Sequence, residues 1–211
     1  DLDDYEWADL VDELDKKKLL ADPTSDYLKA GVSAMNRAKD DAIYQAARGN
    51  ARSSTGTVAL PAGQKVAVAA TGLTKAKIIQ TKKMFRANEA DEENGEELYF
   101  SYGSEQMEDL MGDTTLTSAD YMAVQMLQDG KVARKWMGFT WVPSERMTKV
   151  TNDRFCIAWA KSGMALGIGA DIMTRVTERA DKSYAMQPYA RMSIGATRVE
   201  DAKVVEVSCQ E

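Results

Sequence analysis

Residues 24–48, TSDYLKAGVSAMNRAKDDAIYQAAR, give the strongest prediction about the fold. Its apolar residues recur at three- and four-residue spacing, which is typical of a helix with one buried face. They are Leu28, Val32, Met35, Ala42, Ile43 and Ala46. Thr24 or Ser25 is expected to cap the first turn, and Gly49 is expected to take the left-handed conformation after the last turn. Such a helix is about 36 Å long and would serve as a spine for other elements.

The sequence on either side of this helix predicts a mixed series of elements. A helix is expected over residues 4–20, ended by Pro23 because the residue before proline avoids the helical region. Residues 50–63 are small and turn-forming and predict a loop. The elements expected next are a strand at Lys65–Ala70, a helix from a Thr74 cap to Ala87 with Leu73 and Ile78 as a hydrophobic staple, a strand at Leu98–Tyr102, and short helices at 105–111 and 119–128 capped by Ser104 and Ser118.

Residues 118–147, SADYMAVQMLQDGKVARKWMGFTWVPSERM, join a short helix, an Asp129-Gly130 turn and a strand carrying Trp136, Phe139 and Trp141. They contain no histidine, no cysteine and no phosphate-binding glycine loop, so they contribute shape and not chemistry. After the turn the chain is rich in strands, expected near 131–142, 153–160, 164–168, 184–192 and 203–209. Helices first and strands last are typical of an α+β protein in which a late strand returns to the early helix.

The composition narrows the possible functions. The chain has 211 residues and a formal net charge of −6, which argues against binding nucleic acid mainly through phosphate neutralisation. It has no histidine, which removes Ser-His-Asp and Cys-His nucleophile systems and every histidine-ligated metal site. Enzymes built on carboxylates, lysine or Ser-Lys pairs stay open. Cys156 and Cys209 are expected to be reduced thiols. No apolar run approaches the ~18 residues that cross a bilayer.

Two loops invite a ligand-binding interpretation, and a structural one is preferred for each. The acidic residues 89–97 lack the spacing of a calcium-binding loop, so a solvated loop is expected. Three glycines resemble a nucleotide-binding loop, but their spacing fits neither dinucleotide nor P-loop motifs, and glycines that let strands pack closely are expected. They are Gly163, Gly167 and Gly169.

Two basic groups are likewise interpreted as structural. The helix after Thr74 is basic without interleaved aromatic residues, so a solvated helix is expected. Its basic residues are Lys75, Lys77, Lys82, Lys83 and Arg86. The C-terminal region alternates basic and acidic residues, which suits ion pairs within or between subunits. The basic ones are Arg175, Arg179, Lys182, Arg191 and Arg198. No catalytic, cofactor-binding or metal-binding residue, and no cofactor, is therefore predicted.

Three segments, taken in order, resemble the major capsid proteins of tailed double-stranded DNA bacteriophages. Residues 22–51, DPTSDYLKAGVSAMNRAKDDAIYQAARGNA, are similar to the long spine helix of that fold. Residues 73–147, which include a G-F-x-W-V-P-S strand, are similar to its axial domain. Residues 175–211, with a Gly-Ala-x-Arg before the final run, are similar to its closing strands.

The resemblance implies an α+β capsid fold with a long spine helix, a peripheral β-sheet and a mixed α/β axial domain. Residues 1–65, with the spine helix at 24–48, and residues 169–211 would form the peripheral domain, and residues 66–168 the axial domain. Subunits of this family assemble as pentamers and hexamers into an icosahedral shell around DNA. The expected partners are other copies of the chain, scaffolding and portal proteins, and DNA through loose proximity only, with no membrane. The expected location is the virion, assembled in the bacterial host cytoplasm.

Several alternatives accompany this resemblance. The family carries an N-terminal arm and an extended β-hairpin loop before the segment similar to residues 1–20, and the chain does not contain them. The chain also does not begin with methionine, so a truncated core of a longer subunit is expected. A nanocompartment shell protein of the same fold stays open as an alternative. A hydrolytic enzyme without histidine and a virion accessory protein, such as a decoration or connector protein, fit less well.

Overall fold

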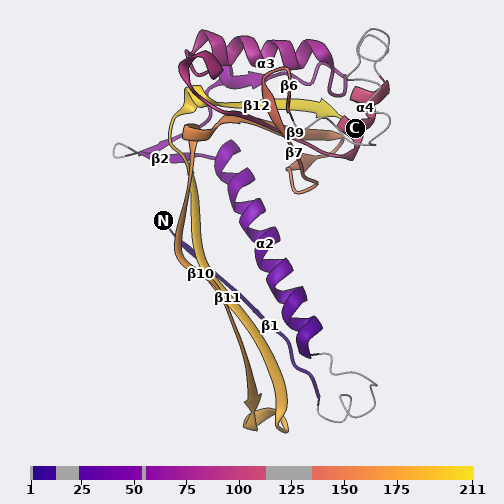
Figure 1. The fold of residues 1–211 in the computed structure, drawn as a ribbon, viewed down its shortest axis with the longest axis vertical. Coiled ribbons are helices and arrows are strands. Elements are labelled where there is room, and N and C mark those ends of the chain that lie inside the picture. The colour runs from indigo at the N-terminus through magenta and orange to yellow at the C-terminus, as the bar shows by residue number, and fades with distance from the viewer. Residues whose placement is uncertain (1, 13–23, 54–55, 113–134) are drawn as a thin grey trace. The chain divides into compact units, whose positions relative to one another are not determined.

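The computed structural model describes residues 2–12, 24–53, 56–112 and 135–211 (Figure 1). The chain forms two compact units, each built from segments far apart in sequence. The first unit comprises Asp1–Ile43 and Leu166–Ala196, and the second comprises Tyr44–Ala165 and Thr197–Glu211. The predicted helix at 119–128 with its Ser118 cap, and the turn at Asp129-Gly130, lie outside the described residues.

Helix α2 (Thr24–Arg48) is one uninterrupted helix, which confirms the predicted spine. In the first unit its buried Met35 forms a small core with residues of a single strand, namely Ala190, Met192 and Ile194. Gly31 on the same helix leaves room for an aromatic ring, because a Cβ atom there would lie 2.5 Å from Cε3 of Trp7. A late strand therefore returns to the early helix, as the α+β pattern predicts.

The C-terminal end of α2 differs from the prediction. The backbone N–H of Gly49 donates to the carbonyl of Gln45 at 2.7 Å, which continues the helical hydrogen-bond pattern. Gly49 does not have a positive φ, so the expectation of a left-handed residue here is wrong. The chain instead passes directly into strand β2 (Ala51–Ser53), which pairs with β3 (Gly56–Val58) in a two-stranded hairpin.

A three-stranded antiparallel sheet completes the first unit, with strand order β1-β11-β10. Its strands are β1 (Asp3–Ala8), β11 (Ala185–Arg198) and β10 (Met164–Arg179). The helix expected over residues 4–20 is wrong where it overlaps β1, and residues 13–23 lie outside the described residues. Tyr5 and Trp7, two positions apart, both pack against the core around Met35, and strand alternation puts them on that one face.

Strands β10 and β11 are longer than the sequence predicts. The expected strands at 164–168 and 184–192 become 16 and 14 residues long. Most β10 side chains are exposed, and from Asp171 onward polar residues are mixed with the apolar ones, so a search for apolar alternation does not find the full strand. Gly169 confirms the expected packing role, because a Cβ atom there would lie 2.6 Å from Cδ1 of Leu2.

The second unit is built on a mixed sheet of seven strands, with order β4-β12-β9-β5-β7-β6 and β8 paired to β9. The strands are β4 (Lys65–Val66), β5 (Leu98–Tyr102), β6 (Lys135–Trp136), β7 (Phe139–Pro143), β8 (Lys149–Val150), β9 (Asp153–Ala160) and β12 (Val204–Gln210). β12 and β9 run antiparallel, in register from Val204↔Trp159 to Gln210↔Asp153. β5 and β7 run parallel.

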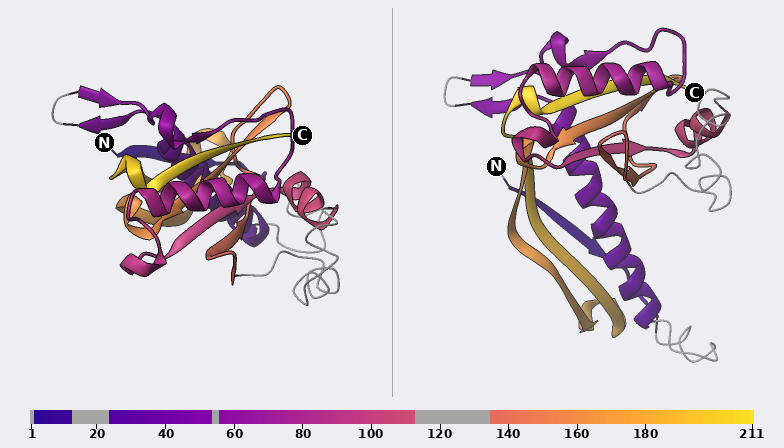
Figure 2. Two further views of the ribbon diagram at one scale, coloured as in Figure 1. Left: turned by 90° about the horizontal axis from the view of Figure 1, so that it is seen from above. Right: turned by 45° about the horizontal axis from the view of Figure 1, so that its top comes forward.

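Helix α3 (Lys75–Ala87) lies along β12 in both views of Figure 2, and α4 (Ser104–Gly112) follows β5. The Thr74 side chain caps α3 by accepting from the backbone N–H of Lys77 at 3.4 Å, as predicted. The described residues also form short 3₁₀ turns, η1 (Ala62–Gln64), η2 (Glu92–Asn94), η3 (Lys161–Gly163), η4 (Ala180–Lys182) and η5 (Asp201–Lys203).

Three predicted elements of this unit need correction. The strand expected at Lys65–Ala70 ends at Val66, because Ala69 and Ala70 have positive φ values of 49° and 51°. The single strand expected at 131–142 is a hairpin in its described part, since a turn at Met137-Gly138 separates β6 from β7. Ser104 was expected to cap a helix that begins at residue 105, but α4 begins at Ser104, so this serine is the first helical residue.

Aromatic rings fill the core of the second unit, as expected for the G-F-x-W-V-P-S strand. Phe139 and Trp141 on β7 are 0% and 4% exposed. The Trp141 ring lies 4.7 Å from that of Phe100, and its Nε1 donates to the carbonyl of Trp136 at 3.1 Å. Cys156 and Cys209 are buried free thiols, as predicted. The hydrogen bond with the Cys209 thiol, together with burial, raises the pKa of Cys156 well above its usual value.

Candidate functional site: internal polar anchors and exposed surfaces

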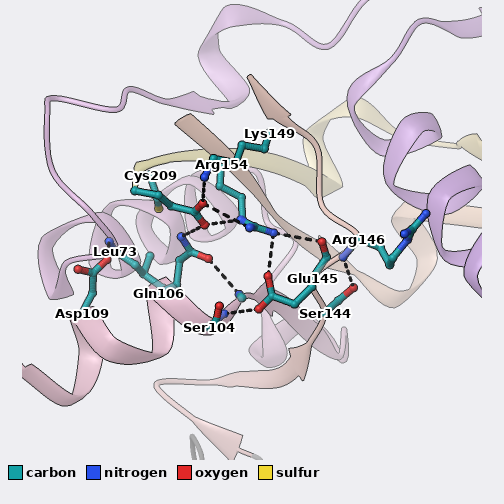
Figure 3. A network of polar contacts seen from close by, with 12 residues as sticks. Leu73, Ser104, Gln106, Asp109, Ser144, Glu145, Arg146, Lys149, Arg154 and Cys209 are labelled. Carbon is teal, nitrogen blue, oxygen red and sulfur yellow. Dashed lines mark hydrogen bonds and ion pairs between the residues drawn. The ribbon is translucent and has the colours of Figure 1, made fainter. Parts of the chain in front are cut away.

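A polar network of the second unit surrounds the carboxylate of Glu211. Figure 3 shows its partners Arg154, Lys149 and Gln106 pointing toward one another. Glu211 follows β12, and its carboxylate pairs with the guanidinium of Arg154 on β9. Lys149 on β8 contacts the same carboxylate at 2.7 Å. The side-chain amide of Gln106 on α4 donates to it at 3.0 Å. One carboxylate therefore links three separate elements to the end of β12.

The charge state of this network follows from its partners. Burial alone would raise the pKa of Glu211, but the hydrogen bonds from Arg154, Lys149 and Gln106 lower it to about 2. Burial opposes the charge on Arg154, and Glu211 outweighs that effect and raises the pKa of the guanidinium. Glu211 and Arg154 are thus each held ionised by the other, and neither acts as a general acid or base near neutral pH.

The network continues into the start of α4. The carboxylate of Glu145 accepts from Nη1 of Arg154 at 3.0 Å and from the backbone N–H of Ser104. The side-chain oxygen of Gln106 accepts from the backbone N–H of Gly103 at 3.0 Å. These contacts satisfy N–H groups that a helix leaves free at its first turn, so the network holds the N-terminus of α4 in place.

A second anchor is Arg198, whose side chain is 0% exposed. Its guanidinium donates to the carbonyls of Ala47, Gly49 and Val58 at 3.0, 2.8 and 2.9 Å. It also pairs with Asp201. Within the second unit, one buried cation therefore joins the end of α2 to the β2–β3 hairpin. The expected ion pair at Arg198 is present, but most of its contacts are to backbone carbonyls.

A third anchor is Lys77, which corrects the expectation that α3 is basic and solvated throughout. Lys77 is 5% exposed, and its Nζ donates to the carbonyls of Val68, Thr71 and Ser208 at 2.8, 2.7 and 2.8 Å. Burial lowers the pKa of Lys77. Its place in the sequence carried the signal, because Lys77 falls at the four-residue spacing of the buried Thr81 and Phe85.

The acidic loop at 89–97 and the basic helix before it largely neutralise each other. Lys82 pairs with Glu92, and Arg86 contacts Asp91 at 2.8 Å and Glu93 at 2.6 Å. Among the described residues, no group of three potential ligands is placed to hold a metal ion. The acidic loop is therefore an ion-paired surface.

The glycine-rich loop has a packing role at Gly163. This glycine lies against Lys203, because a Cβ atom at residue 163 would be 2.7 Å from Cβ of that lysine.

The remaining candidates are surfaces. Several large apolar side chains are strongly exposed on the two units, among them Ile79 on α3 and Ile168 and Met173 on β10. Of the other basic residues in the C-terminal region, Arg175 and Arg179 lie on β10, Lys182 on η4 and Arg191 on β11. Arg179 pairs with Asp181 at 2.7 Å. No helix in the described ranges is long and apolar enough to span a membrane. The described part of the molecule thus offers fixed internal anchors and partly apolar outer faces.

Solved structures share this fold. A structure from Mycobacterium phage Che8 has a TM-score of 0.72 at 18% identity, covering 97% of this chain and 70% of that chain. The capsid structure of the cyanophage P-SCSP1u has a TM-score of 0.66 at 14% identity, covering 99% and 72%. The holo-SrpI encapsulin complex from Synechococcus elongatus PCC 7942 has a TM-score of 0.63 at 10% identity, covering 99% and 74%. At these identities the likeness establishes the tailed-phage capsid fold alone.

The family is decided by the sequence itself. No curated protein matches the chain. The family described as phage capsid protein matches residues 1–211. A capsid protein is a structural component of the virion and not an enzyme, which agrees with charged anchors that are all internally paired. The chain belongs to the phage capsid protein family.

Proposed function

We propose that copies of this chain assemble as pentamers and hexamers into an icosahedral shell around packaged phage DNA. The family match over residues 1–211 carries this proposal. The net charge of −6 agrees with a shell that lies near DNA without binding it tightly. Scaffolding and portal proteins are proposed as further partners during assembly.

The domain roles are part of the same proposal. Residues 1–65 and 169–211 act as the peripheral domain, and residues 66–168 as the axial domain around the symmetry axes, with the C-terminal strand β12 contributed to the sheet of the second unit. The three internal anchors all lie in the second unit and support its rigidity, because Glu211, Arg198 and Lys77 each join elements distant in sequence. A rigid unit suits a shell, whose stability comes from modest interfaces repeated by symmetry.

The test is electron microscopy of the product of the complete gene, expressed in bacteria and purified in native buffer. Closed shells or capsomer rings are expected. Extraction of nucleic acid from particles made during infection distinguishes a virus shell from a nanocompartment, which would hold protein cargo instead. A product that stays monomeric from micromolar to millimolar concentration, with scaffolding protein present, contradicts the proposal.

A further inference from the structure

Two helices of the second unit present exposed faces of opposite charge. On α3, Lys75, Ile79 and Lys83 are all exposed and are spaced four residues apart, so they form one stripe along the helix. Ile79 at its centre is 49% exposed. Among the residues that the structure describes, neither Lys75 nor Lys83 has an ion-pair partner, in contrast to Lys82 on the neighbouring face. This set of three residues is called the basic stripe below.

The exposed face of α4 is acidic. Glu105 and Glu108 are exposed one turn apart, and within the described ranges neither carboxylate has an ion-pair partner. A hollow of about 500 Å³ lies beside them, lined also by Thr74, Asp109 and Gly112. Asp109 is not available for a partner, because it accepts from the backbone N–H of Leu73 at 2.7 Å. Glu105 and Glu108 with the hollow are called the acidic face below.

The rigidity of both surfaces makes them suitable for docking. The buried side of α3 packs in the core through Ile78 and Phe85, both 0% exposed. The N-terminus of α4 is held by Glu145 and Gln106, as described above. Neither helix therefore needs to be ordered on binding, which avoids an entropic cost of association.

We infer that the basic stripe of one copy docks on the acidic face of α4 in the next copy around a ring. The inference rests on the proposed shell function, and it names the surfaces and the partner, a second copy of this chain. The two patches differ, so a contact between them is heterologous, which is the kind of contact from which a closed ring is built. Ile79 supplies an apolar centre, and the lysines and glutamates supply a charged rim that sets orientation and suppresses wrong contacts.

The inference is tested by charge reversal in the complete gene product. The variant Lys75→Glu/Lys83→Glu carries acidic groups on both helices, and Glu105→Lys/Glu108→Lys carries basic groups on both. Each is expected to raise the concentration needed for ring formation by about tenfold or more, because like charges then face each other. The variant with all four changes is expected to form shells at a concentration within about threefold of the unchanged protein, since complementarity is restored.

Mixing the two double variants gives a second readout that also reports whether they fold. Each then meets only the complementary variant, so rings must alternate. Rings with an even number of subunits are expected to form, whereas pentamers and closed shells are not. Native mass spectrometry resolves these species. Glu178→Lys, an exposed change on β10 in the other unit, is the control for net charge and is expected to assemble normally.

The outcomes separate the inference from the function on which it rests. If the unchanged protein forms no rings or shells, the proposed function fails. If it assembles and both double variants assemble equally well, the inference is overturned while the function stands. The inference is also overturned if the double variants fail and neither the fourfold variant nor the mixture restores assembly.

Discussion

Replacing Arg198 with methionine should destabilise the second unit by about 4 kcal/mol. The substitution keeps a long side chain in the buried site and removes the guanidinium that serves three carbonyls and one carboxylate. A buried carbonyl without a donor costs about 1–3 kcal/mol. The hydrogen bond to Ala47 is buried, so its loss should have the full free-energy cost. Those to Gly49 and Val58 are partly buried, so the loss of each should have about half of that cost. The resulting sum agrees with the ~3–5 kcal/mol for removing one partner of a buried ion pair.

Urea unfolding followed by tryptophan fluorescence measures this loss as a change in midpoint at constant slope. Arg198→Lys keeps the charge but loses the planar fork of donors, so it is expected to lose roughly half as much. Lys161→Met is the matched control in the same unit, because Lys161 pairs with Glu97 at 3.1 Å and is 69% exposed. This control should cost less than about 1 kcal/mol. A loss below about 1 kcal/mol for Arg198→Met would refute the reasoning that the buried guanidinium organises this region.

Three further predictions concern other parts of the described structure. Trp141→Ala should cost about 3–5 kcal/mol in the second unit, since the ring is 4% exposed among aromatic neighbours, and a thermal melt without loss of stability would contradict that placement. Stability should fall as the pH drops from about 4.5 towards 2. The pKa of Glu211 is lowered in the folded protein, so the stabilisation from its ionised form is fully present above that range and is lost gradually within it. Acid titration of Glu211→Gln should show a weaker fall in stability, and an unchanged titration argues against the network. Gly31→Ala should destabilise the first unit by about 1–3 kcal/mol through overpacking against Trp7, even though alanine favours the helix by up to about 1 kcal/mol. A gain in stability in calorimetry would count against the close contact.

Elements with strong local signals were predictable. Helix α3 has a capping threonine and a clear apolar spacing, and β5 and β9 have apolar runs of strand length, so their limits agree with the prediction. Strand β1 was not predicted, because it contains few apolar residues and their spacing fits a helix as well as a strand. In the structure Tyr5 and Trp7 alternate as in a strand and face the core. Its strand form depends on hydrogen bonding to β11, some 180 residues further along the chain.

That the chain carries no catalytic, cofactor-binding or metal-binding residue stays a prediction. The basic residues show why charge patterns alone mislead. Lys77 and Lys83 are six positions apart on one helix, yet one is buried under three carbonyls and the other is exposed. Their roles differ because only one of them faces β12.

The sequence alone is enough to predict the long helix at Thr24–Arg48, the α+β order of elements and the lack of histidine chemistry, because helix periodicity, strand composition and residue types are local properties. Which charges become internal anchors depends on the tertiary fold. Arg198, Lys77 and Glu211 each find their partners far along the chain, and the free energy of a buried charge depends on whether folding brings those partners within hydrogen-bonding distance.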